Sequence, residues 1–266
     1  MKALRWMSRS AVAVLLVCFA GGVAEAQVDQ DQLIERLRHG DRDARARAAQ
    51  AVLEMGPRNA APPLRKAMIS TLVDEVERDA AWRRGEAHGA ENAETVAQMA
   101  WVVAQFEDPR AVEALVGALG TGAGAIWGLA TLGDPAVGAT VAAARTREGR
   151  GSTDIITDAL LALRFLAEGV GRVPLSPSSR EQVTAVARER LEPKQPYVSI
   201  LRRAIDLAVV LDDPGLRAIV AAIAADPAEV EARVENPSKR GVEWVREAAV
   251  ERLSGVPPLP RWSRRW

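Results

Sequence analysis

The sequence predicts an all-α fold, an α-solenoid of stacked antiparallel helix pairs, and three observations support this prediction. Apolar residues recur at helical spacing, for example within 48–55, 112–119 and 201–208. No convincing run alternates β-branched and polar residues, so no strand is expected. An Asp-Pro step recurs where one apolar segment ends and the next begins. A composition with 48% hydrophobic and 4% aromatic residues and no net charge excludes a disordered chain and gives no general basic footprint for nucleic acid.

The first element, residues 1–26, is expected to be a signal peptide rather than part of the fold. Its first nine residues include Lys2, Arg5 and Arg9, the stretch 11–20 is apolar, and Ala24-Glu25-Ala26 places small residues where a signal peptidase reads them. We therefore expect cleavage before Gln27. The alternative is a retained membrane anchor, for which the apolar stretch is short, since a span needs about 20 residues.

Cleavage predicts a bacterial protein that is periplasmic or secreted, without a transmembrane segment. Cys18 would leave with the peptide, because it follows Val17 inside the apolar stretch and does not resemble a lipoprotein signal. The chain from Gln27 onward then has no cysteine, so it needs no disulfide in an oxidising compartment. Removal of the basic leader also leaves this chain slightly acidic.

The body, residues 27–255, is expected to consist of helix pairs with recognisable starts. Asp suits the N-cap and Pro the first helical position, so each Asp-Pro step predicts a helix start. These steps are Asp108-Pro109, Asp134-Pro135, Asp213-Pro214 and Asp226-Pro227. Further along, we expect one long charged helix over 63–84 and two helices near 154–168 and 178–191, joined by the linker 169–177. Ser178-Ser179-Arg180-Glu181 fits a capping box at the start of the second of these helices.

Internal similarity points to repeats. The pair Ala48-Ala49, followed by Leu53 and Gly56, is matched by Ala248-Ala249, followed by Leu253 and Gly255. These Ala-Ala pairs, the Asp-Pro junctions and the segment 43–56 resemble the HEAT-repeat proteins, particularly the short HEAT-like repeats first associated with phycobilisome lyases. The resemblance covers about residues 29–255. It implies a fold of stacked helix pairs and leaves function open, because the repeated residues serve packing and capping.

Candidate chemistry is sparse, and we expect no cofactor, no metal site and no catalytic residues. The Gly-rich stretch 120–124 lacks the preceding strand of a dinucleotide loop, so it predicts a turn between helices. His39 and His88 have no second ligand at metal-binding spacing, and both are expected at helix ends. Ser152 has no histidine nearby in the sequence and predicts a helix cap.

Two kinds of HEAT-like enzyme provide rival interpretations. The HEAT-like hydroxylases bind iron through paired His-Glu motifs, and this chain has no His-Glu step. The HEAT-like DNA glycosylases for alkylated bases use Trp, Asp and Arg without a metal, and the chain contains Trp82, Trp101, Trp127 and Trp244. The export signal and the lack of basic charge oppose that assignment, and these tryptophans are expected to fill gaps between helices.

The tail, residues 256–266, differs in kind from the body. Three prolines within 256–260 prevent a helix, and the binding residues we assign follow them: Arg261, Trp262, Arg264, Arg265 and Trp266. Arg and Trp anchor interfaces, so the tail is a candidate to bind a partner groove or an anionic membrane surface. The alternative is that it covers the apolar face of the last repeat.

The sequence thus predicts an exported, non-catalytic scaffold that binds protein partners in the cell envelope. An alternative is an accessory or regulatory subunit that clamps an envelope enzyme. An enzyme of another type, such as an alkyl-base DNA glycosylase, ranks behind both. No nucleic-acid partner is expected.

Overall fold

The structure is a computed structural model that describes residues 30–83, 93–146, 152–171, 174–192 and 194–255. These ranges are helical apart from their connections, and the β-structure within them is one isolated bridge between Gln195 and Val234. The prediction of an all-α chain is confirmed. The expected signal peptide and the tail lie outside the described residues.

The helices follow one another with short connections. Residues 30–39 are helical and precede the elements with these bounds: α2 Arg42–Met55, η1 Pro57–Asn59, α3 Pro62–Arg83, α4 Ala93–Ala104, η2 Pro109–Ala111, α5 Val112–Gly117, α6 Ala123–Leu132, α7 Asp134–Ala144, α8 Ser152–Ala167, α9 Pro177–Leu191, α10 Val198–Leu211, α11 Pro214–Ala225, α12 Pro227–Arg233 and α13 Lys239–Leu253. The long helix expected over 63–84 is α3, and the two helices expected near 154–168 and 178–191 are α8 and α9.

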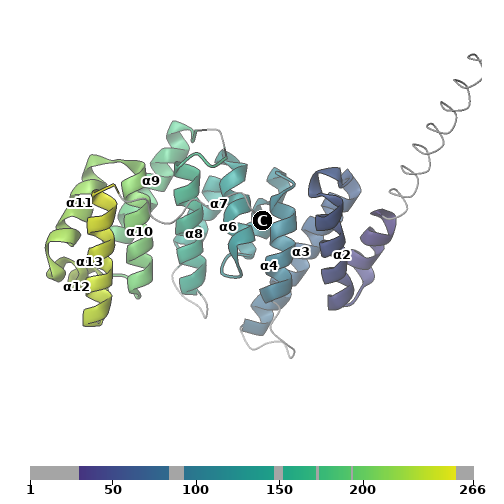
Figure 1. Cartoon of the computed structure of the whole chain (residues 1–266), viewed down its shortest axis with the longest axis horizontal. Coiled ribbons are helices and arrows are strands. Elements are labelled where there is room, and N and C mark those ends of the chain that lie inside the picture. Colours follow the sequence, from purple (N-terminus) through teal and green to yellow (C-terminus); the bar gives the residue numbers. More distant parts are fainter. Residues whose placement is uncertain (1–29, 84–92, 147–151, 172–173, 193, 256–266) are drawn as a thin grey trace, which may run out of the picture.

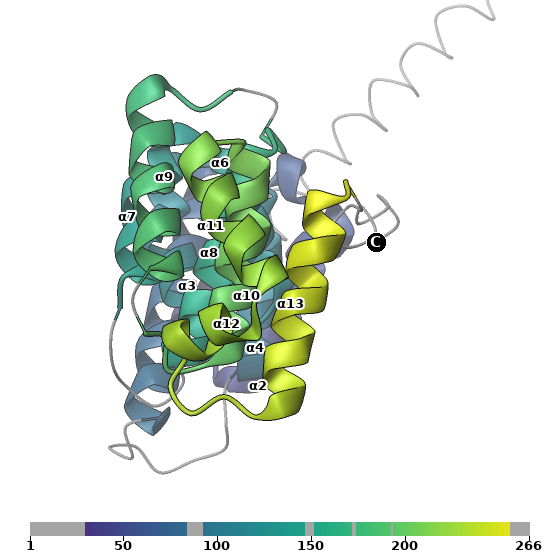
Figure 2. The same cartoon turned by 90° about the vertical axis from the view of Figure 1, so that its left-hand side faces the viewer.

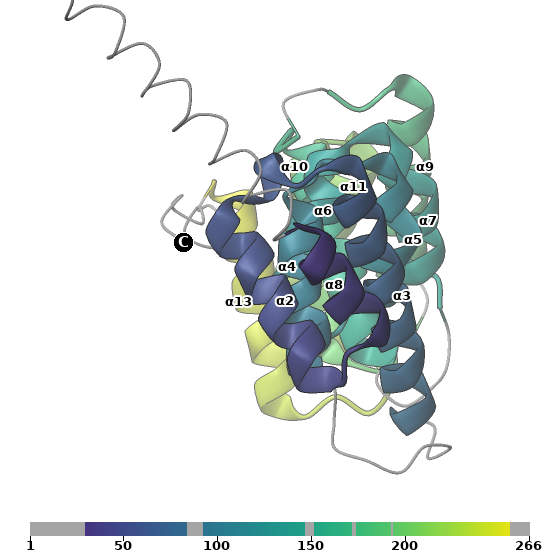
Figure 3. The same cartoon turned by 90° about the vertical axis from the view of Figure 1, so that its right-hand side faces the viewer.

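The helices form two layers. In the first layer each of α2, α4, α6, α8, α10 and α13 packs against the next, and in the second layer α3, α5, α7, α9 and α11 do so. Contacts such as α3 with α4 and α7 with α8 join the layers. Figure 1 shows the resulting row, and Figures 2 and 3 look along it, with α13 on one side and α7 and α9 on the other. The first layer therefore presents an outer surface built from six successive helices.

One hydrophobic cluster runs through the row from Leu33 to Ala249. Its largest fully buried side chains are mainly Leu and Met, and alanines such as Ala48 and Ala49 fill the narrow contacts between helices. Burial of apolar surface contributes about 25 cal/mol per Å², so this continuous cluster is the main source of stability. The Ala-Ala pairs lie in first-layer helices, α2 and α13, as their similarity predicts.

Two glycines bring α4 and α6 close together. A Cβ on Gly124 would lie 2.5 Å from the backbone N of Trp101, and one on Gly128 would lie 2.8 Å from the Cβ of Ala104. Side chains at these positions would force the helices apart. The Gly-rich stretch is thus a turn that leads into a closely packed helix, which confirms the turn predicted there.

The predicted caps are correct in most cases. Asp108, Asp213 and Asp226 each accept a hydrogen bond from a backbone N–H in the turn that follows, at 3.0, 2.9 and 2.9 Å. Arg110 also holds the pKa of Asp108 below its usual value, chiefly through a side-chain hydrogen bond and despite partial burial. These acidic residues therefore act as helix caps.

Two predicted caps are wrong. Asp134 is the first residue of α7 rather than its N-cap, which is Gly133, and its carboxylate accepts the backbone N–H of Ser176 at 3.1 Å. That hydrogen bond lowers the pKa of Asp134. The capping box at Ser178 is also wrong, because α9 begins earlier, at Pro177, and the hydroxyl of Ser176 is the cap. The cap therefore lies two residues before the predicted one, with Pro177 at the first helical position.

Candidate functional site

The tail residues that we predicted to bind a partner lie outside the described residues. These are Arg261, Trp262, Arg264, Arg265 and Trp266. His88 also lies outside them, whereas His39 ends the helical residues 30–39, where its Nε2 lies 3.8 Å from Glu35. The prediction of a helix-end histidine is confirmed for His39.

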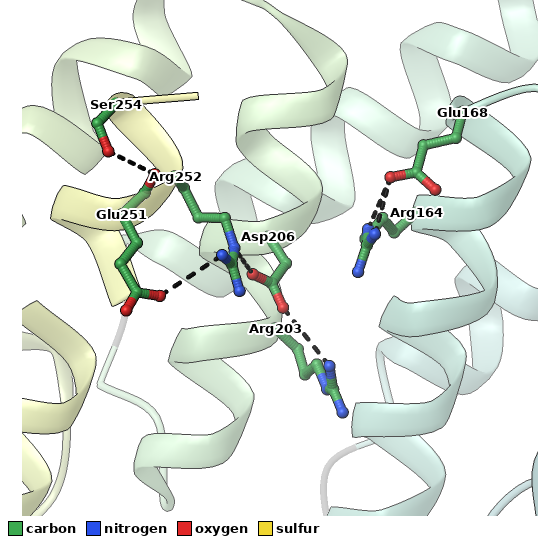
Figure 4. A network of polar contacts seen from close by, with 7 residues as sticks. All are labelled: Arg164, Glu168, Arg203, Asp206, Glu251, Arg252 and Ser254. Atoms are coloured by element: carbon green, nitrogen blue, oxygen red, sulfur yellow. Dashed lines mark hydrogen bonds and ion pairs between the residues drawn. The ribbon is translucent and has the colours of Figure 1, made fainter. Parts of the chain in front are cut away.

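A buried ion-pair cluster joins α10 to α13 in the first layer, and no sequence motif indicated it. The Nε of Arg252 donates to the carboxylate of Asp206 at 2.7 Å, and Arg203 lies 3.5 Å from its other oxygen. The Asp206 side chain is 1% exposed and that of Arg252 is 5% exposed. Glu251 lies 3.6 Å from Arg252 (Figure 4). The buried carboxylate of Asp206 thus serves as counter-ion to one arginine on its own helix and to one on α13.

A second ion pair, between Arg164 on α8 and Glu168 just after the end of that helix, lies nearer the middle of the row (Figure 1). Arg164 donates to Glu168 at 2.9 Å (Figure 4). The guanidinium of Arg164 also lies 5.2 Å from the ring centroid of Phe165. The Arg164 side chain is almost fully buried, whereas Phe165 is half-buried. The pair therefore combines charge with apolar packing around a largely buried guanidinium.

A similar arrangement joins α2 to α3 near the other end of the row. The Glu75 side chain is 1% exposed, and the Nε of Arg45 lies 2.6 Å from its carboxylate. Arg78 contacts the same carboxylate oxygen from the next turn of α3. This cluster ties the two layers together, so we assign it a structural role.

The carboxyl of Asp158 on α8 has a raised pKa. Its carboxylate accepts the backbone N–H of Gly120 at 2.9 Å, which anchors the Gly-rich turn to α8. Burial raises the pKa of Asp158 to about 6, and the Gly120 hydrogen bond and the charge of Arg203 oppose that rise. A carboxyl with such a pKa is a candidate for proton transfer, and the charge of Asp154 adds to the rise. Because the Asp158 carboxylate anchors the turn at Gly120, we assign it a structural role.

The one exposed tryptophan of the described helices lies beside an arginine. The guanidinium of Arg202 on α10 lies 4.2 Å from the ring centroid of Trp244 on α13. Trp244 is 38% exposed, and the Nε of Arg202 is buried with no hydrogen-bond partner among the described residues. Burial lowers the pKa of Arg202, and the charges of Arg203 and Arg252 act in the same direction. Trp244 was expected to fill a gap between helices, and its exposure corrects that prediction.

Other first-layer aromatic side chains are partly exposed. Trp101 on α4 and Trp127 on α6 are half-buried, like Phe165 on α8, and Trp127 packs against the hydrophobic cluster as predicted. Four first-layer helices, α4, α6, α8 and α13, thus each place an aromatic side chain partly at the surface. Sequence spacing identifies the helices, but the packing is needed to show that these four helices belong to one layer.

The described residues contain no group of three or more His, Cys, Asp or Glu side chains placed to hold a metal ion. Across the same ranges, no helix combines the length and apolar character needed to traverse a bilayer. Comparison of the chain with protein-family models, with curated proteins and with solved structures finds no match.

Proposed function

We propose that the chain is an exported, non-catalytic protein-binding scaffold built as an α-solenoid of HEAT-like repeats. The two-layer row supports the architecture, because helices pack chiefly on the neighbours before and after them in each layer. Proteins built in this way use the extended surface of one layer to bind other proteins.

The observation that carries the binding proposal is the aromatic content of the first-layer surface. Trp101, Trp127, Phe165 and Trp244 come from four helices of that layer and are all partly or fully exposed. Aromatic residues and arginine are enriched at protein interfaces, because they bury much area with little loss of side-chain freedom. The aromatic residues are spread along the row, which suits a partner that lies across several helices.

The expected signal peptide supports an envelope or extracellular partner. The basic leader, the apolar stretch 11–20 and the cleavage site before Gln27 are the features that direct export. Finding the mature N-terminus at Met1 in the cytoplasm would refute this localisation. Finding it at Gln27 in a periplasmic or culture fraction would support it.

Affinity capture from an envelope fraction tests the binding proposal. The chain from Gln27 is used as bait, together with a variant lacking 256–266. We expect a specific partner whose capture falls in Trp101→Ala and is unchanged in Val73→Ala, which trims an exposed apolar side chain on the second-layer helix α3. Failure of both baits to retain any specific partner would contradict the proposal. A partner that proves to be an envelope enzyme, with activity altered by the bait, would assign the accessory-subunit role.

The shortened bait also separates the two roles left open for the tail. If the tail binds the partner or a membrane surface, its removal lowers capture and leaves the melting temperature unchanged. If the tail covers the last helices, its removal lowers the melting temperature, because apolar surface becomes exposed.

A further inference from the structure

One side of α13 exposes acidic and apolar side chains together. Glu243, Glu247 and Glu251 are exposed and follow one another at intervals of four residues, so they lie along the same side of the helix. Trp244 and Val250 are 38% and 53% exposed and lie on that side as well. We call these five residues the acidic face of α13. The buried residues of α13 lie on the opposite side of the helix, so the acidic face is open to an occupant.

The charges of the acidic face favour a cationic occupant. Within 241–255 the exposed charged residues are its three glutamates. Like charges four residues apart repel each other, and Glu251 lies in the last turn of α13, where the helix dipole disfavours a carboxylate. Glu251 lies 3.6 Å from Arg252, whereas Glu243 and Glu247 form no ion pair with another described residue. Cations placed along this side of the helix would relieve both the repulsion and the unfavourable dipole contact.

The tail, residues 256–266, follows α13 directly and has the complementary chemistry. It contains three arginines, two tryptophans and no acidic residue. From Arg261 to Arg265 an extended chain spans about 13 Å. From Glu251 back to Glu243 the helix measures about 12 Å. The five residues before Arg261 match the length of common connections between antiparallel elements, so the tail is long enough to turn back along the acidic face.

We propose that the tail of the same chain docks on the acidic face of α13, with its three arginines paired to the three glutamates and one of its indoles packed against Trp244. The covalent link favours this occupant over a basic segment of another molecule, because it holds the tail beside the face at a high effective concentration. Each exposed ion pair contributes little alone, so the three pairs and the aromatic contact act together. This inference goes beyond the proposed scaffold function and does not depend on it.

Paramagnetic NMR on the full chain tests the docking directly. Ser263→Cys in a Cys18→Ser background provides a single thiol, within the tail, for a nitroxide label. A nitroxide broadens the signals of nearby amides. We expect broadening in α13 and none in α2, which lies at the other end of the row (Figure 1). Because the proposed contacts are exposed ion pairs, the broadening in α13 should also fall in 1 M salt.

Substitutions on the acidic face assign the contact. Replacing its three glutamates by Gln, which keeps good helix formers, should weaken docking at least about threefold and reduce the broadening in α13 accordingly. The matched control replaces three exposed glutamates on other helices by Gln and should leave the broadening unchanged: Glu54, Glu113 and Glu181. Reversing the charges on both sides, with Glu→Arg on the acidic face and Arg→Glu in the tail, should restore docking that either reversal alone abolishes.

Three results would overturn the proposal. These are no broadening in α13, equal broadening in the folded Gln variant of the acidic face, and broadening that arises only between two molecules. The third is detected by mixing a labelled chain with an unlabelled, isotope-enriched chain, and it would assign the occupant to a second copy. Each of these results leaves the scaffold function standing, because the envelope capture described above tests that function separately.

Discussion

Replacing Asp206 by Asn isolates the contribution of the buried charge cluster to the stability of the last helices. The substitution preserves the size of the side chain and removes its charge. Arg252, whose side chain is 5% exposed, then loses the carboxylate that lies 2.7 Å from its Nε. The change therefore leaves a buried guanidinium without its main counter-ion.

The expected cost follows from the burial of both partners. Removing one member of a buried ion pair costs about 3–5 kcal/mol. Glu251, 3.6 Å from Arg252, offers some compensation, and Arg203 is exposed enough to turn toward water. We therefore expect a value at the lower end, about 3 kcal/mol, expressed as easier opening of α13 from α10.

Amide hydrogen exchange read by mass spectrometry measures this opening locally. A loss of about 3 kcal/mol corresponds to exchange in α13 that is roughly a hundredfold faster. Asp212→Asn is the matched control, because Asp212 is exposed and its pair with Arg217 contributes less than about 1 kcal/mol. Replacing Asp206 and Arg252 together by Leu and Met should restore slow exchange, since no unpaired charge remains.

Two results would refute this reasoning. One is exchange in α13 of Asp206→Asn within about threefold of wild type, well below the roughly hundredfold expected. The other is a double variant as labile as the sum of its single variants, which would mean that Asp206 and Arg252 are not energetically coupled.

Three further predictions concern helix contact, titration and capping. Gly124→Val should lower stability by about 1–3 kcal/mol in urea denaturation, because the new side chain meets the backbone of Trp101, whereas Gly138→Ala, where a Cβ meets nothing within 4 Å, should be neutral or stabilising. An equal loss from both would contradict the close approach of α4 and α6. Asp158 has a folded pKa of about 6, above its ordinary value, so the folded state holds the proton more tightly and stability falls as pH rises from about 4 to about 6. Asp158→Asn should remove that fall and raise the melting temperature more at pH 7 than at pH 4, and an equal change at both would count against it. Asp213→Ala should cost about 1 kcal/mol through loss of the cap of α11, and an unchanged denaturation midpoint would show that this cap contributes little.

Sequence reasoning worked where a feature depends on neighbours along the chain. Asp213-Pro214 starts a helix because its own side chain and the following proline meet the needs of the first turn. The long helix α3 and the turn at 120–124 follow from local periodicity and glycine content in the same way.

It failed where a side chain acts on a distant part of the chain. Asp134 looks like the other caps, yet its carboxylate bonds to Ser176, 42 residues later. Asp206 lies in an apolar helix with no motif around it, and its role depends on α13 packing beside α10, which brings up Arg252 from 46 residues away. The pairing of Arg202 with Trp244 likewise depends on the packing of these two helices. Spacing along one helix carries no information about such contacts.

The isolated bridge between Gln195 and Val234 has a mechanical consequence. The backbone N–H of Gln195 donates to the carbonyl of Arg233, and the carbonyl of Gln195 accepts the N–H of Glu235 at 2.9 Å. The connection before α10 is therefore hydrogen-bonded to the connection before α13. Together with the ion pair between Asp206 and Arg252, this bridge links α10 and α13 at two places, one before the helices begin and one within them. Separating α13 from α10 would therefore require breaking both links, and these links hold Arg202 beside Trp244.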